Sequence, residues 1–104
     1  MPLQADQSFL LIVDVQRQLA PDTHDPQRTI MGCGRLIEAA RILEVPTLMS
    51  EHYPQGLGPT VPELRGLVPD DAVIDKAHFS CAADEDFKAR IDGLGRRQAV
   101  IAGM

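Results

Sequence analysis

The sequence is poor in aromatic residues and in cysteine. It has no Trp, one Tyr and three Phe, so aromatic residues make up 4% of its 104 residues. Proteins that bind single-stranded nucleic acid stack bases on aromatic side chains, and this composition argues against that class. The two cysteines, Cys33 and Cys81, are too few for a disulfide framework and form no CxxC pair. We expect both to be free thiols in a reducing cytoplasm.

Long apolar runs and positive charge are also scarce. The longest apolar run covers residues 9–13, far short of the roughly 18 residues that a membrane helix needs. The first residues lack the basic start and apolar stretch of a signal peptide. Ten Lys and Arg oppose fifteen Asp and Glu, which gives a net charge of −5. We therefore expect neither nucleic acid nor a membrane as a partner, because both are anionic surfaces.

The remaining composition, 44% hydrophobic and 24% charged, is that of one small globular domain. Short apolar runs at 9–13, 47–50, 72–76 and 99–102 predict four strands. The first run is apolar throughout, which is typical of a strand buried on both faces of a parallel sheet.

Two longer segments predict helices. Apolar residues from Ile30 to Leu43 recur every three or four positions, after Asp25 as N-cap and Pro26 in the first turn. Acidic residues at 84–86 precede a second apolar stripe that contains Ile91. We expect the core to include Leu36, Ile37, Leu43 and Ile91.

The segment 51–71 is rich in Gly and Pro. Thr60 and Glu63 have capping-box spacing, so we expect one short helix there and otherwise irregular chain.

Strands that alternate with helices predict an α/β fold, a three-layer α/β/α arrangement around a Rossmann-like parallel sheet with strand order 3-2-1-4. Ligands of such sheets bind at the carboxyl ends of the strands. Asp14 follows the first predicted strand, residues 50–52 end the second, and Lys76 ends the third. The fourth strand is followed only by Gly103 and Met104. We therefore expect residues 1–104 to be the N-terminal part of a single larger domain.

Four segments, in order along the chain, resemble a known family. They are residues 11–16 (LIVDVQ), 51–64 (EHYPQGLGPTVPEL), 75–81 (DKAHFSC) and 98–104 (QAVIAGM). Together they resemble the isochorismatase-like hydrolase superfamily, which includes nicotinamidases, and in particular its isochorismatase-domain-containing branch.

The resemblance implies a catalytic triad of Asp, Lys and Cys. Asp14 and Lys76 match the first two members, and the cysteine would follow a few residues beyond Met104, so neither Cys33 nor Cys81 matches it. The implied activity is hydrolysis of an amide or other C–N bond of a small molecule through a thioester, without a cofactor. The implied partners are a small-molecule substrate and either further copies of the chain or a chain that carries the missing C-terminal half.

Four further residues are candidates for substrate binding: Gln16, His52, Tyr53 and Phe79. Gln16 could contact Asp14 or substrate, and a surface glutamine is an equal alternative. Phe79 could line the pocket or pack in the core. Nicotinamidases carry a metal near strand two, but the pattern at His52 differs from their Asp-x-His arrangement. We therefore expect no metal there, and either a loop histidine or a wall of the substrate pocket.

Two other functions are compatible with the same elements. One is a catalytically inactive α/β binding or interaction module. The other is a nucleotide-binding fragment, which is disfavoured because no GxGxxG loop follows the first strand. The 104-residue chain alone is expected to be inactive.

Overall fold

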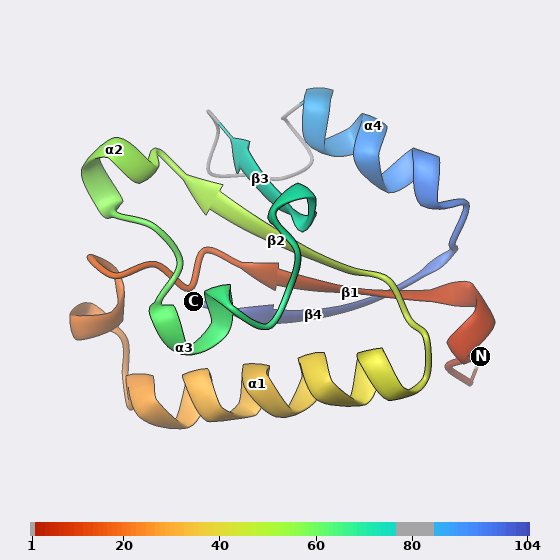
Figure 1. Ribbon diagram of the computed structural model, residues 1–104, viewed down its shortest axis with the longest axis horizontal. Coiled ribbons are helices and arrows are strands. Elements are labelled where there is room, and N and C mark those ends of the chain that lie inside the picture. The colour runs from red at the N-terminus through yellow and green to blue at the C-terminus, as the bar shows by residue number, and fades with distance from the viewer. Residues whose placement is uncertain (1, 77–84) are drawn as a thin grey trace.

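The computed structural model describes residues 2–76 and 85–104 (Figure 1). The strands are β1 (Ser8–Val13), β2 (Thr47–His52), β3 (Val73–Lys76) and β4 (Gln98–Gly103). The α-helices are α1 (Pro26–Ile42), α2 (Pro54–Leu57), α3 (Pro62–Arg65) and α4 (Glu85–Leu94), and the short 3-10 helices are η1 (Ala5–Gln7), η2 (Ala20–Asp22) and η3 (Asp70–Ala72).

All four strands are parallel and lie in the order β3-β2-β1-β4, which confirms the predicted topology. Figure 1 shows α1 and α3 on one face of the sheet and α4 on the other, so the three layers are also confirmed. Five of the six residues of β1 are buried, because this central strand is covered on both faces.

The larger core lies between α1 and the sheet. The Asp25 carboxylate accepts a hydrogen bond from the Arg28 amide at 3.3 Å and caps α1, with Pro26 as its first residue. The inward face of α1 buries four residues against Leu10, Ile12 and Met49 of the sheet. These four are Ile30, Cys33, Ile37 and Ala40. The core position predicted for Ile37 is therefore confirmed.

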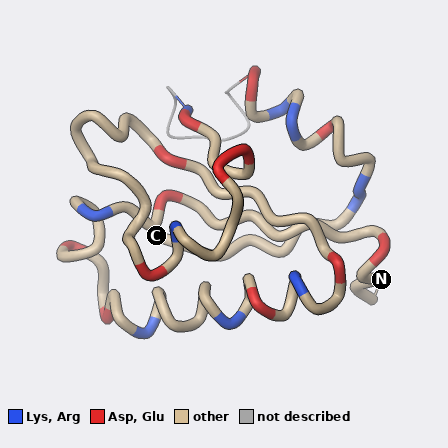
Figure 2. Tube along the Cα trace, viewed as in Figure 1, with Lys and Arg blue, Asp and Glu red and all other residues tan. Residues whose placement is uncertain are grey.

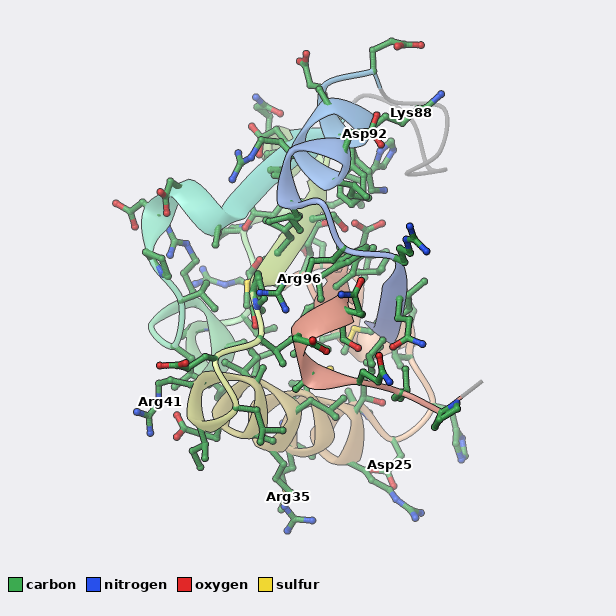
Figure 3. All side chains as sticks on the ribbon, turned by 90° about the vertical axis from the view of Figure 1, so that its right-hand side faces the viewer. Asp25, Arg35, Arg41, Lys88, Asp92 and Arg96 are labelled. Carbon is green, nitrogen blue, oxygen red and sulfur yellow. The ribbon has the colours of Figure 1, made fainter. Side chains whose placement is uncertain are left out.

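The smaller core lies under α4. Phe87 is completely buried and packs against the sheet residues Phe9, Leu11, Leu48 and Ile74. Ile91 and Leu94 of α4 are partly buried and pack against the same cluster. In contrast, the charged side chains of the helices point away from the sheet, as Figure 3 shows for Arg35 and Arg41 on α1 and Lys88 on α4. Charges of both signs are spread along the described trace (Figure 2).

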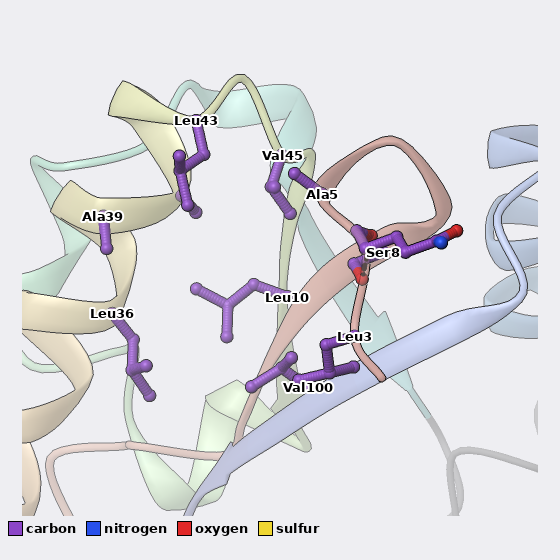
Figure 4. Close-up of a pocket in the computed structure, with 11 residues that line it drawn as sticks. Leu3, Ala5, Ser8, Leu10, Leu36, Ala39, Leu43, Val45 and Val100 are labelled. Atoms are coloured by element: carbon purple, nitrogen blue, oxygen red, sulfur yellow. Dashed lines mark hydrogen bonds between the residues drawn. The ribbon is translucent and has the colours of Figure 1, made fainter. Parts of the chain in front are cut away.

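The prediction that Leu36 and Leu43 are core residues is wrong. They are 37% and 60% exposed, since Leu36 lies on an outer flank of α1 and Leu43 is the residue that follows the last turn of this helix. There they line a groove of about 230 Å³ with Leu10 and Val100 (Figure 4). The N-terminal residues Leu3, Gln4 and Ala5 also line this groove, and Leu36 and Leu43 remain partly open to solvent.

The connection between β2 and β3 differs from its prediction. It contains two short α-helices, α2 and α3, in place of one. The capping-box prediction is also wrong, because Val61 is the N-cap of α3 and makes no side-chain cap bond. The Thr60 hydroxyl and amide instead donate to Glu51 Oε2, each at 2.7 Å. Burying the Glu51 carboxylate without hydrogen-bond donors would be costly. The bonds from Thr60 to Glu51 are therefore favoured over capping of α3 by Thr60.

Candidate active site

Asp14 is the first residue after β1, and its backbone has an unusual conformation. Its φ angle is +53°, in the left-handed region. Non-glycine residues seldom adopt this region, although Asp tolerates it better than most. Backbone strain of this kind often accompanies functional sites. The sheet compensates for it, because the Asp14 amide still donates to the Ser50 carbonyl at 3.2 Å.

Lys76 ends β3, and its side chain reaches across β2 to Asp14. The Lys76 Nζ donates to Asp14 Oδ2 at 2.9 Å, and the Lys76 side chain is completely buried. The structure therefore brings together the two residues predicted to be catalytic, at the carboxyl edge of the parallel sheet. Removing one member of a buried ion pair destabilises a protein strongly, because the other charge is then buried without compensation.

Ser50 is a third member of this cluster that the sequence analysis did not single out. It pairs in register with Val13, so its side chain lies beside Asp14. The Ser50 Oγ donates to Asp14 Oδ1 at 2.7 Å. Each oxygen of the Asp14 carboxylate thus accepts a hydrogen bond, one from β2 and the other from β3. In the sequence, the feature that could have identified Ser50 as a site residue is its position at the end of the second predicted strand.

Gln16 is completely buried, so the alternative of a surface glutamine is wrong. Its Nε2 donates to the carbonyls of His52 at 3.0 Å and Gly58 at 2.8 Å, and its Oε1 accepts from the His52 amide at 2.8 Å. The side chain thereby continues the β1–β2 pairing beyond the last strand residues. It fixes the segment that follows β2 relative to the segment that follows β1.

His52 and Tyr53 lie beside a surface cavity of about 500 Å³ that Lys76 also lines. Its other lining residues are Pro54, Gln55, Asp75 and Asp86. Tyr53 is 60% exposed and has a left-handed backbone, with φ of +44°. These two predicted substrate-binding residues therefore share one cavity with the candidate catalytic lysine. Phe79 and Cys81 lie outside the described residues.

Cys33 is an unsuitable nucleophile. It is buried on α1 among apolar side chains, and burial raises the pKa of its thiol. A raised pKa lowers the fraction of reactive thiolate at neutral pH. Within residues 2–76 and 85–104, we find no group of three or more His, Cys, Asp or Glu that could hold a metal ion. The helices of the same part of the chain are too short or too polar to cross a membrane.

The fold matches solved structures of α/β proteins. A structure described as MAR1 ribonuclease from Caenorhabditis elegans superposes with a TM-score of 0.87 and 30% identity, over 99% of this chain and 53% of that chain. The YcaC gene product of Escherichia coli, described as an octameric hydrolase of unknown specificity, superposes with a TM-score of 0.85 and 28% identity, over 98% of this chain and 52% of that one. The class that the fold defines is therefore a three-layer α/β protein whose structural neighbours include a hydrolase.

A comparison at the level of sequence identifies the family. The model of the isochorismatase domain matches residues 8–104, so the chain belongs to the isochorismatase family. Isochorismatase domain-containing protein 2 of Danio rerio is 38% identical over 96 residues, which cover 90% of this chain and 46% of that protein. The chain thus spans about half the length of this curated relative.

Proposed function

We propose that the chain is the N-terminal part of one isochorismatase-like domain that hydrolyses an amide or other C–N bond of a small molecule. Asp14 and Lys76 would act with a cysteine that lies outside these 104 residues. The observation that carries this proposal is the buried contact between Lys76 Nζ and Asp14 Oδ2 at the carboxyl edge of the sheet.

The two groups have complementary roles in this chemistry. Asp14 would accept the proton of the cysteine thiol, so that the thiolate attacks the substrate carbonyl carbon. As the C–N bond breaks and the thioester forms, Asp14 would return the proton to the leaving amine. Water would then hydrolyse the thioester, which releases the acid and regenerates the thiol. The Lys76 ammonium would stabilise negative charge on the carboxylate, the thiolate and the carbonyl oxygen.

The carboxylate retains room for this proton. An ionised carboxylate has about four lone-pair positions. Among the described residues, Ser50 and Lys76 supply one side-chain donor to each oxygen of Asp14. A further position on the carboxylate can thus accept the thiol proton.

The path of β4 supports a nucleophile beyond the fourth strand. The Met104 amide donates to the carbonyl of Val13 at 3.0 Å, and Val13 immediately precedes Asp14. Chain that continues from Met104 would therefore start beside the carboxylate. A thiol a few residues further on would be within its reach.

The outer edge of β4 supports a larger domain. Among the described residues, β4 pairs with β1 alone, and Ile101 is 65% exposed. An apolar hollow of about 360 Å³, which Ile101 and Phe87 help to line, flanks β4 on the α4 face. The groove at Leu36 and Val100 flanks it on the α1 face. A further strand with helices on both faces would cover these surfaces, either from the same polypeptide or from another.

We also propose an oligomeric state and a cellular compartment for the protein. The Escherichia coli neighbour is described as octameric, and we propose a homo-oligomer here. A catalytic cysteine acts in its reduced form, which the cytoplasm maintains, so we propose the cytoplasm as the compartment.

The decisive experiment extends the reading frame past Met104 and assays the encoded protein on a panel of small amides that includes nicotinamide. We expect turnover that Asp14→Asn and Lys76→Met each abolish and that Glu38→Gln leaves unchanged, because Glu38 belongs to an exposed ion pair on α1. An absence of cysteine in the residues that follow Met104 would contradict the proposal.

Two further assays separate the alternatives. The 104-residue chain alone should not hydrolyse amides, and turnover that disappears on replacing Cys33 or Cys81 would overturn the assignment of the nucleophile. Because the Caenorhabditis elegans neighbour is described as a ribonuclease, the panel should include RNA. Cleavage of RNA without cleavage of amides would replace this proposal, although a net charge of −5 disfavours a polyanionic substrate.

A further inference from the structure

We infer that Ser50 is a positioning residue for Asp14, which it holds through both the backbone and the carboxylate. This inference rests on the proposed function, since Asp14 is the proton acceptor of that mechanism. It concerns a residue on β2 that acts through the Asp14 carboxylate and, in the mechanism above, does not contact the substrate.

The contacts between the two residues are reciprocal. The Asp14 amide donates to Ser50 Oγ at 3.3 Å as well as to the Ser50 carbonyl. The same Oγ donates its proton to Asp14 Oδ1 at 2.7 Å. One hydroxyl therefore bonds both to the amide and to the side chain of Asp14, in the way that a capping residue satisfies a helix end.

These bonds restrict both the backbone conformation of Asp14 and the rotation of its carboxylate. Its left-handed backbone, with φ of +53°, is unfavourable by itself and must be stabilised by its surroundings. Its carboxylate could rotate if Lys76 were the only donor, because a single bond to Oδ2 leaves Oδ1 free. A donor from β2 on Oδ1 and a donor from β3 on Oδ2 fix the plane of the carboxylate. Reactions that depend on proton transfer require such a fixed geometry.

A simpler explanation is that Ser50 is a buried hydroxyl that has found a partner. Ser8 is a suitable comparison, because it is also buried and lies at the opposite end of the sheet, on β1. The Ser8 Oγ donates to the main-chain carbonyl of Gln4 at 2.6 Å. Such a bond satisfies a hydroxyl without orienting any ionised side chain. Ser50 differs because its acceptor is the carboxylate of Asp14.

The test uses nuclear magnetic resonance on the isotopically labelled protein encoded by the reading frame extended past Met104, and on its Ser50→Ala, Ser50→Thr and Ser8→Ala variants. In the unmodified chain we expect side-chain couplings of Asp14 that report one χ1 rotamer. Ser50→Ala should average these couplings over rotamers and raise hydrogen exchange at the Asp14 amide roughly two- to tenfold, the factor that loss of one hydrogen bond produces. Ser50→Thr keeps the hydroxyl and should restore the single rotamer. Ser8→Ala should leave Asp14 unchanged.

One Asp14 rotamer in a folded Ser50→Ala variant would overturn the inference. If the Ser50→Ala variant does not fold, a measurement on the unmodified protein tests the inference. A slowly exchanging Ser50 hydroxyl proton with a nuclear Overhauser contact to the Asp14 β protons supports the inference, and its absence contradicts it. Because these measurements need no turnover, failure of the proposed hydrolase activity would leave them interpretable, and the reverse also holds.

Discussion

Lys76 and Asp14 are 62 positions apart in the sequence, yet Lys76 Nζ lies 2.9 Å from Asp14 Oδ2. The contact spans three strands, since β2 separates the strands that end at these two residues. Ser50 of β2 completes the arrangement from between them. A buried carboxylate and a buried ammonium are thus held at the edge where parallel sheets bind ligands.

The first prediction concerns the stability of this pair. Lys76→Met alone should destabilise the chain by about 3–5 kcal/mol, because it leaves the Asp14 carboxylate buried without its counter-charge. The double variant Asp14→Asn with Lys76→Met should be more stable than either single variant. Urea unfolding of all four chains measures this coupling. The exposed pair Arg41–Glu38 is the control, and Glu38→Gln should leave the unfolding free energy nearly unchanged, because water screens this pair. Additive effects of the two buried substitutions would contradict the prediction.

The second prediction concerns Gln16. Gln16→Glu keeps the size of the side chain but replaces the amide group that donates to the carbonyls of His52 and Gly58. A carboxylate cannot donate to these oxygens, so we expect a loss of about 1–3 kcal/mol. Hydrogen exchange should increase first in the 53–60 segment that Gln16 fixes. An unfolding free energy within error of the unmodified chain would show that these bonds contribute little.

The third prediction concerns Gly103, at the end of β4. A Cβ built at this residue would lie 2.2 Å from the Val13 carbonyl oxygen, and its φ is +144°. Gly103→Ala should therefore push the end of β4 away from β1 and cost about 1–3 kcal/mol. Gly32→Ala is the matched control, because nothing lies within 4 Å of a Cβ at Gly32 in α1. It should stabilise the chain by about 0.5–1 kcal/mol. Equal effects of the two substitutions in thermal unfolding would refute this steric account.

The fourth prediction concerns the pH dependence that Cys33 introduces. Burial raises the pKa of its thiol, so the unfolded chain loses this proton at lower pH than the folded chain does. The stability that the neutral buried thiol contributes is complete below the unfolded pKa of about 8.5. It is lost as pH rises through the folded value. The unfolding free energy of the unmodified chain relative to Cys33→Ala, measured in urea from pH 7 to 10, should fall with pH. A difference independent of pH would contradict this assignment.

Much of the fold could be predicted because its signals are local. The apolar run at 9–13 and the spacing from Ile30 to Ala40 predict a buried strand and a one-sided helix, and both occur. The errors arose where distant contacts decide. Leu43 follows the helical spacing but stays 60% exposed at the edge of an open groove. Thr60 bonds to Glu51 of β2 in preference to a helix end.

The sequence by itself determined the order of strands and helices and placed Asp14 and Lys76 at strand ends, because periodicity and strand termination are properties of neighbouring residues. Only the tertiary structure decided that Ser50 bonds to Asp14 and that Gln16 is buried between the segments that follow β1 and β2. Those contacts depend on the register of parallel strands and on the left-handed turn at Asp14. Such geometry is set by packing across the sheet, which no local pattern in the sequence records.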